Sequence, residues 1–427
     1  MHTEAVNLAG PLTAAGAASA PRFQVSLRAI RRAVLWLLIA CGCVGAIQPS
    51  PYEFMFLAAA LAFARDGLLF DRAMIPLIVL LAMYNAGGLL ALAPWVGDSD
   101  SVTFVATSIY IGITAVFFAA LIAKDPLAHM RTIRSGYVAA GCVAASFGIA
   151  GYFDVAGLGE YLTLYGRAAG TFKDPNVFGP FLVPPMVWLT QDVLLKRGAG
   201  LWRAALPFLV MFLGLLLSFS RGAWGVWAAS TFLMVALTFL TTTSASARQR
   251  IASVSALGLV AIATLLVIAL SIPEIRNVFE IRASLNQDYD LGEVGRFGAQ
   301  VRSIPLLLEA PFGFGPLQFR NLFHNADPHE VYLNAFASYG WLGGLSYLSL
   351  AGVTLYYCLR LPFLRTPFQS EAIAACCCLA VQLLQGVQID TDHWRHLFLL
   401  FGIVYGLGAA SRRYPAGPRR VRGALAD

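Results

Sequence analysis

Long runs of apolar residues, 15 to 22 at a stretch, recur along the 427-residue chain and constrain its fold more than any other feature. A soluble protein carries about 25% charged residues, whereas this chain has 12% charged and 58% hydrophobic residues. Runs of this length cross a bilayer as helices, because a helix satisfies its own backbone hydrogen bonds in lipid. The sequence therefore predicts an all-α polytopic membrane protein.

We expect about twelve transmembrane helices from these runs. The second run is short for a full crossing, and a re-entrant segment is the alternative there. The expected spans are 33–48, 52–64, 73–93, 102–123, 136–153, 178–195, 204–219, 222–240, 251–271, 333–358, 371–389 and 396–411.

The distribution of charge orients these spans. With the N-terminus inside, 21 of the 30 Lys and Arg residues fall in cytoplasmic segments, and 15 of the 23 acidic residues fall outside. This separation follows the positive-inside rule and places both termini in the cytoplasm. We expect a disordered cytoplasmic tail (1–25), a twelve-span membrane domain (26–411) and a basic cytoplasmic tail (412–427). The loop 272–332 is long enough for a small periplasmic subdomain.

Nine basic residues remain on the outer side, and eight of them are arginines, whose fork of donors suits phosphate oxygens. Arg221 stands in a tight turn between two apolar runs, "LLLSFSRGAWGVW" (215–227). A charge so close to the bilayer needs a partner or a polar cavity. An arginine that only snorkels to the interface is the alternative.

A second basic stretch, "YGRAAGTFKDPNVFGPFL" (165–182), holds Arg167, Lys173 and Asn176. Asp174 and Pro175 indicate a helix start whose backbone N–H groups face outward, where an anion can bind. The alternative is that Asp174 only caps the helix while the basic groups are solvated.

The stretch "FHNADPHEVYLN" (323–334) contains His324, His329 and Glu330. Pro328 predicts a helix that begins near His329, and the positive helix end favours a neutral imidazole that can accept a proton. A hydrogen-bonded interfacial histidine is the alternative. The spacing does not suit a metal site, and the chain lacks nucleotide-binding loops. We therefore expect no metal, no cofactor and no nucleic-acid partner.

A third outer segment, "QIDTDHWRHLF" (388–398), crowds acids, histidines and an arginine between two spans. Asp392, His393 and Arg395 are candidates for orienting a sugar or bracing another arginine. A local ion network without direct chemistry is the other interpretation.

Three stretches occur in one order, "GRAAGTFKDPNVFGPFL", "SFSRGAWG" and "GRF…PFGFGPLQF…PHEVYLNAFASYGWLGG". Their order and topology resemble the O-antigen ligase/polymerase superfamily over about residues 160–350. Arg221 matches the arginine of the family's S-x-S-R-G turn, and Arg296 matches the arginine before "PFGFG". His329 begins the motif written H-N-x-Y-L, in which Glu330 replaces the asparagine.

The resemblance implies a fold like that of the GT-C membrane glycosyltransferases, in the bacterial inner membrane. The donor would be a glycan on undecaprenyl diphosphate, and the acceptor would be lipid A–core or another polysaccharide. Catalysis would rest on His329, Arg221 and Arg296. Arg302, in "GRFGAQVRSIP", is a further candidate for substrate binding. Ligase and polymerase remain alternatives, and a polysaccharide or lipid transporter is the rival from another class.

Overall fold

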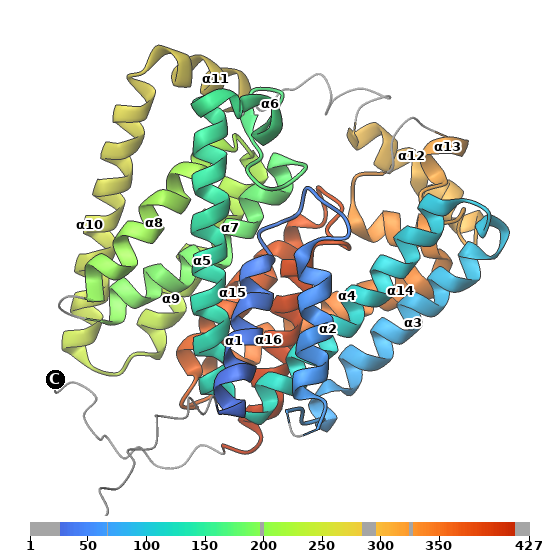
Figure 1. Ribbon diagram of the computed structural model, residues 1–427, viewed down its shortest axis with the longest axis horizontal. Helices are drawn as coiled ribbons and strands as arrows, with labels where there is room; N and C mark the ends of the chain where they lie inside the picture. Colours follow the sequence, from blue (N-terminus) through green and yellow to red (C-terminus); the bar gives the residue numbers. More distant parts are fainter. Residues whose placement is uncertain (1–25, 66, 197–199, 284–295, 324–327, 415–427) are drawn as a thin grey trace, which may run out of the picture.

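A computed structural model of the chain describes residues 26–65, 67–196, 200–283, 296–323 and 328–414. The tail predicted over 1–25 and most of the basic tail 412–427 lie outside the described residues. Within them the protein is almost wholly helical, as expected (Figure 1). Its α-helices are α1 (Leu27–Cys41), α2 (Pro51–Phe63), α3 (Ile75–Leu92), α4 (Ser99–Lys124), α5 (Pro126–Tyr152), α6 (Gly159–Leu162), α7 (Pro175–Leu195), α8 (Gly200–Leu217), α9 (Arg221–Thr241), α10 (Ala245–Leu270), α11 (Pro273–Ala283), α12 (Arg296–Glu309), α13 (Phe319–Leu322), α14 (Val331–Arg360), α15 (Gln369–Gln385) and α16 (Arg395–Ser411).

Each of the twelve predicted spans overlaps with one of these helices. By length and composition, seven of the described helical segments are suited to cross a membrane: 72–95, 99–124, 126–152, 175–195, 221–241, 245–268 and 331–363. The helices α2, α8 and α16 are apolar but shorter. The structure is thus that of an all-α polytopic membrane protein, and the count of twelve crossings stays a prediction.

The first predicted span, 33–48, is wrong at its end, because α1 stops at Cys41. The chain then forms a loop in which the N–H groups of Gly45 and Ala46 both donate to the Thr171 carbonyl at 2.9 Å. Gly45 lies so close to Phe172 that a Cβ there would come within 2.6 Å of the ring. Hydrogen bonding to a distant loop therefore ends the helix early.

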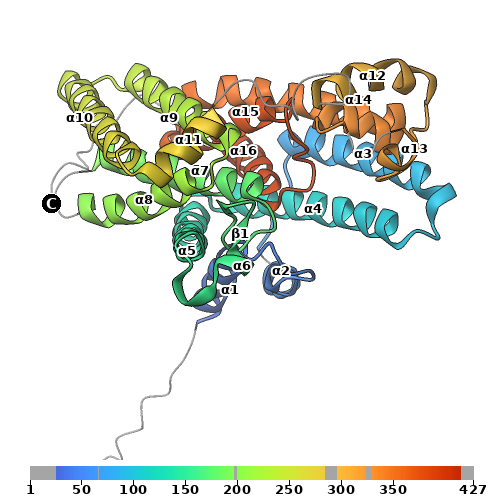
Figure 2. The same cartoon turned by 90° about the horizontal axis from the view of Figure 1, so that it is seen from above.

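The helices are arranged as two groups on either side of α15 and α16 (Figures 1 and 2). One group holds α5 and α7–α11, and the other holds α3, α4 and α12–α14. The helices α6, α11, α12 and α13 lie at one end of the molecule (Figure 1). Glycines allow the closest contacts: a Cβ on Gly402 or Gly406 of α16 would lie 2.8 Å from a carbonyl of α4. Small residues four apart let membrane helices approach this closely.

A two-stranded hairpin is the exception to the all-α fold in the described part of the chain. Strand β1 (Thr163–Leu164) pairs with β2 (Arg167–Ala168). Tyr165 and Gly166 between them have φ values of 53° and 71°. Positive φ at both turn positions suits a two-residue hairpin loop. The turn directs the chain back toward the start of α9.

The helix α14 is broken at Gly340, which has φ 68° and ψ −169°. Residues 311–314 fill the break: the Phe314 N–H donates to the Ala337 carbonyl at 2.7 Å, and the Trp341 N–H donates to the Pro311 carbonyl at 2.9 Å. Only glycine adopts this backbone conformation readily. The segment after α12 is thereby fixed against α14, close to the candidate site.

Candidate functional site

The starts of α7 and α9 meet around Asn176. Its Oδ1 accepts hydrogen bonds from Arg167 Nη2 at 2.8 Å and from Ser220 Oγ at 3.0 Å. Arg167 Nε also donates to the Ser218 carbonyl at 2.9 Å. The hairpin, α7 and the turn before α9 are therefore joined by one hydrogen-bonded cluster, which includes two residues of the predicted site.

Both helix starts beside this cluster are capped by a side chain. Asp174 caps α7 by accepting from the Asn176 N–H at 2.7 Å, and Ser220 caps α9 at the Ala223 N–H. Arg221 is the first residue of α9. The N-terminal ends of helices attract anions, and adjacent arginines strengthen that field. The structure thus brings Arg167, Asn176 and Arg221 together in an electropositive region, with the exposed Lys173 just before α7.

The helix predicted to begin near His329 begins two residues after it. The helix α14 begins at Val331, because Glu330 is its N-cap and accepts from the Leu333 N–H at 3.0 Å. His329 has a left-handed backbone with φ 50°. Its side chain is 47% exposed, and Nδ1 lies 3.9 Å from Asp390 Oδ2. The histidine therefore stands before the helix and is accessible to solvent.

The C-terminal end of α15 connects these two regions. The Val331 N–H donates to the Gly386 carbonyl at 2.9 Å. On the other side, a Cβ on Gly222 would lie 3.0 Å from Gln385 Nε2. The first turn of α9, which holds Arg221, and the first turn of α14, which follows His329, thus pack against neighbouring residues of α15.

The polar loop between α15 and α16 forms a network of its own. Asp392 is buried, accepts from the Tyr84 hydroxyl at 3.3 Å and lies 3.2 Å from His393 Nδ1. His393 Nε2 contacts the Phe104 carbonyl at 3.0 Å. Burial lowers the pKa of His393, but the Asp392 carboxylate and the Phe104 carbonyl outweigh it, so the pKa is raised. His393 therefore links α4 to this loop.

Arg395, the first residue of α16, forms an ion pair with Glu53 and donates to the Val44 carbonyl at 3.1 Å. Its guanidinium also lies 5.4 Å from the centre of the Tyr52 ring. These partners hold the α1–α2 loop and α2 against α16. Its structural contacts favour the ion-network interpretation over direct substrate binding.

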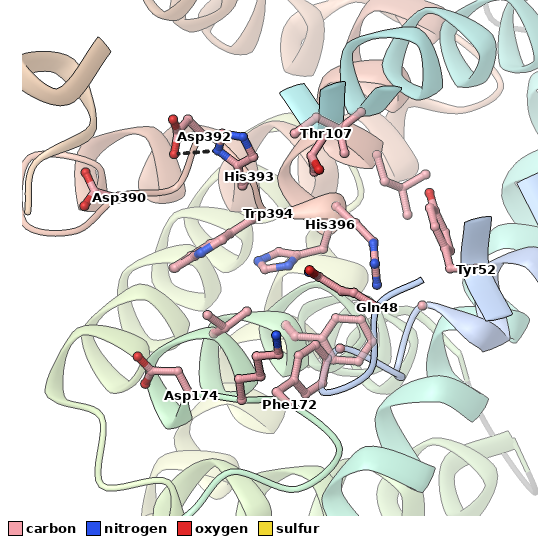
Figure 3. Close-up of a pocket in the computed structure, with 18 of the residues that line it drawn as sticks. Gln48, Tyr52, Thr107, Phe172, Asp174, Asp390, Asp392, His393, Trp394 and His396 are labelled. Carbon is pink, nitrogen blue, oxygen red and sulfur yellow. Dashed lines mark ion pairs between the residues drawn. The ribbon is translucent and has the colours of Figure 1, made fainter. Parts of the chain in front are cut away.

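A cavity of about 520 Å³ lies beside this network (Figure 3). Of the predicted residues, Lys173, Asp392, His393 and Arg395 line it. Asp390, which contacts His329, lines it as well. The site predicted from the sequence did not include the aromatic and uncharged residues of the cavity wall. Aromatic residues next to the polar ends of loops were the sequence feature that could have indicated them. The residues not predicted include Gln48, Tyr52, Phe172 and Trp394, whereas His396 belongs to the predicted outer segment 388–398.

Three other residues of the predicted site take no part in the contacts described above. Arg302 is exposed on α12. Arg296 begins α12, but the structure does not describe its side chain, and His324 lies outside the described residues. Among the residues that the structure describes, no three histidine, cysteine or acidic side chains form a metal-binding group.

Fold and site together define a polytopic membrane protein with a basic cluster at the starts of α7 and α9, a polar cavity and an exposed histidine. Residues 206–348 match the O-antigen ligase family. This match confirms the resemblance to the O-antigen ligase/polymerase superfamily, whose members are glycosyltransferase-like ligases or polymerases. Arg221, Arg296 and His329 fall inside the matched segment, whereas Arg167 and Asn176 precede it. No curated protein matches the chain.

Proposed function

We propose that the protein is an inner-membrane glycosyltransferase of the O-antigen ligase type. It transfers a glycan from undecaprenyl diphosphate to a sugar hydroxyl of lipid A–core at the periplasmic face. The observation that carries this proposal is the arrangement around the end of α15: paired helix starts with Arg167 and Arg221 on one side, and the segment of His329 on the other. One region suits a diphosphate, and the other suits a base.

In the proposed reaction, the acceptor hydroxyl attacks the anomeric carbon of the lipid-linked glycan. A new carbon–oxygen bond forms as the bond to the diphosphate oxygen breaks, so a single displacement inverts the anomeric configuration. His329 takes the hydroxyl proton. Arg221 and Arg296, with Arg167 and Lys173, stabilise the charge that grows on the leaving diphosphate. No step in this scheme uses a metal or a nucleotide.

The proposed topology has both termini in the cytoplasm and the site in the periplasm. It is supported by the excess of Lys and Arg in the segments on the opposite side. The membrane domain would span 26–411 and include the periplasmic loop 272–332, with tails 1–25 and 412–427 in the cytoplasm. In a GT-C-like arrangement, the lipid-linked glycan, the acceptor and membrane lipids would all meet this outer end.

A polysaccharide polymerase is the second candidate, because the matched family supports either activity. The two differ in the acceptor, which for a polymerase is another lipid-linked repeat. Glycolipid analysis of a deletion strain separates them. We expect long polymer stranded on undecaprenyl diphosphate, which indicates a ligase; stalled single repeats would indicate a polymerase.

Complementation of the deletion strain tests the site. Wild-type protein should restore the product, while Arg221→Ala and His329→Ala should not, although both variants reach the membrane in normal amounts. Near-normal product with either variant would contradict the proposed roles. Flipping or uptake of glycolipid by proteoliposomes, without bond formation, would favour a transporter instead.

A further inference from the structure

His396 is a buried polar group that the proposed chemistry does not use. It is the second residue of α16 and is only 4% exposed. Its Nε2 has no hydrogen-bond partner among the described residues, although such an atom normally finds one. The ring is held by aromatic neighbours: Trp394 stacks on it at 5.1 Å between centroids, and Phe181 meets it edge-on at 5.9 Å.

The imidazole lines the cavity rather than the closed core. Figure 3 shows His396 beside Trp394 among the lining side chains. Tyr52 and Phe172 contribute two further rings to the wall. At about 520 Å³, the cavity lies within the range of small-ligand sites, about 300–1,000 Å³, which combine apolar walls with a few polar groups.

The two charged residues nearest to His396 along this wall segment have partners of their own. Arg395 pairs with Glu53, and Asp392 pairs with His393. A charged ligand could use Arg395 or Asp392 only by breaking one of these pairs. A neutral ligand would leave these pairs intact, and it could still form a hydrogen bond with Nε2 of His396.

We propose that His396 and Trp394 form a binding subsite for a neutral sugar ring of the acceptor glycan. A pyranose has an apolar C–H face that packs on an aromatic ring and hydroxyls at its edge that can bond Nε2. This assignment rests on the proposed transferase function. The acceptor is favoured over the donor because Asp390 lines the same cavity and lies 3.9 Å from His329, which must receive the acceptor proton.

Transfer kinetics with purified, reconstituted protein test the subsite. The donor is the lipid-linked glycan that accumulates in the deletion strain, and the acceptor is the polymer-free lipopolysaccharide core of the same strain. For His396→Phe we expect a KM for acceptor raised about five- to tenfold, the effect of one lost hydrogen bond. We expect kcat and the KM for donor to stay within about twofold, because the diphosphate site is untouched.

Two variants control the test. Phenylalanine suits the aromatic surroundings, and His396→Gln, which keeps a hydrogen-bonding group, should return the KM for acceptor toward the wild-type value. His129→Phe changes a half-buried histidine on α5, outside the cavity lining, and should leave both KM values unchanged.

An unchanged KM for acceptor in His396→Phe overturns the subsite, and so does a raised KM for donor alone. Either result would leave the proposed transferase standing, because wild-type turnover and its dependence on Arg221 and His329 are measured in the same assay. If the wild-type protein forms no product from these substrates, the proposed function fails, and the subsite fails with it.

Discussion

At the residue scale, Asn176 joins the two helix starts of the site through one carbonyl oxygen, which accepts from Arg167 and Ser220. Asn176→Ala should lower the transfer rate about tenfold or more and raise the KM for donor. A hydrogen bond to a charged group contributes about 1.5–3 kcal/mol, and about 1.4 kcal/mol is tenfold in rate. Initial rates at varied donor concentration measure this effect.

Asn321→Ala provides a matched control for this variant. Asn321 lies at the exposed end of α13, where its Nδ2 donates to Gln318 Oε1 at 3.2 Å. Its removal should leave the rate within about twofold, because surface substitutions away from special features have effects within about 0.5 kcal/mol. Equal losses in the two variants would contradict a specific role for Asn176 in donor binding.

The side chain of Glu330 should make the stability of the protein depend on pH. Burial raises the pKa of this carboxyl, partly offset by the Leu333 and Tyr332 N–H groups. The folded state therefore binds the proton more tightly than the unfolded state. Its contribution to stability is lost as pH rises from the ordinary carboxyl pKa through the raised value. Glu330→Gln keeps an acceptor for the Leu333 N–H but carries no titrating proton.

Thermal unfolding in detergent measures this difference. The Tm of Glu330→Gln should exceed that of the wild type at pH 7.5, and the gap should shrink toward pH 4.5. Glu309→Gln, an exposed change on α12, should give a Tm difference that does not vary with pH. A gap that widens on acidification would mean that Glu330 is stabilised as a carboxylate in the folded protein.

At the element scale, the break in α14 depends on Gly340. A Cβ there would lie 2.6 Å from the Phe312 carbonyl carbon and from the Pro311 carbonyl oxygen, and φ is 68°. Gly340→Ala should destabilise the fold by about 2 kcal/mol or more, from backbone strain and overlap together. We expect a lower Tm and loss of transfer, because the segment that carries His329 leads directly into this helix.

Gly352→Ala tests whether the effect belongs to the break rather than to glycine as such. Gly352 lies in the same helix, and a Cβ there meets nothing within 4 Å. This variant should keep or raise the Tm, since alanine favours a helix more than glycine does by about 1 kcal/mol. Similar losses in both variants would show that the break at Gly340 has no special role.

The helices of this fold can be predicted from the sequence more readily than the contacts between them. The apolar runs predict twelve helices, because a backbone in lipid must satisfy its own hydrogen bonds and a helix does so. The meeting of Arg167 with Asn176 and Ser220 depends on a hairpin turn at Tyr165 and on the path of α7, which no spacing encodes. His329 was found through a motif. In the sequence, His396 stands among charged residues and was grouped with them. Its different role can be inferred only from its place in the wall of the cavity.

At the scale of the whole molecule, hydrogen-bonded loops rather than long spans bring the site together. Thr171 fixes the loop after α1, Gly386 receives the start of α14, and Glu53 holds Arg395 of α16. Each contact joins segments more than fifty residues apart. In the predicted topology, all of them lie in outer loops or at the outer ends of spans. The proposed orientation is therefore decisive for function, since substrate must reach that side.

Cysteine labelling tests this orientation in a variant whose seven native cysteines are replaced by alanine. Tyr165→Cys, at the 83% exposed hairpin turn, and Leu322→Cys on α13 should react with a membrane-impermeant maleimide in intact spheroplasts. Ser244→Cys, exposed between α9 and α10, should react only after permeabilisation. Three predicted spans separate residues 165 and 244, and four separate 165 and 322. Labelling of all three sites in intact spheroplasts would contradict the twelve-span arrangement.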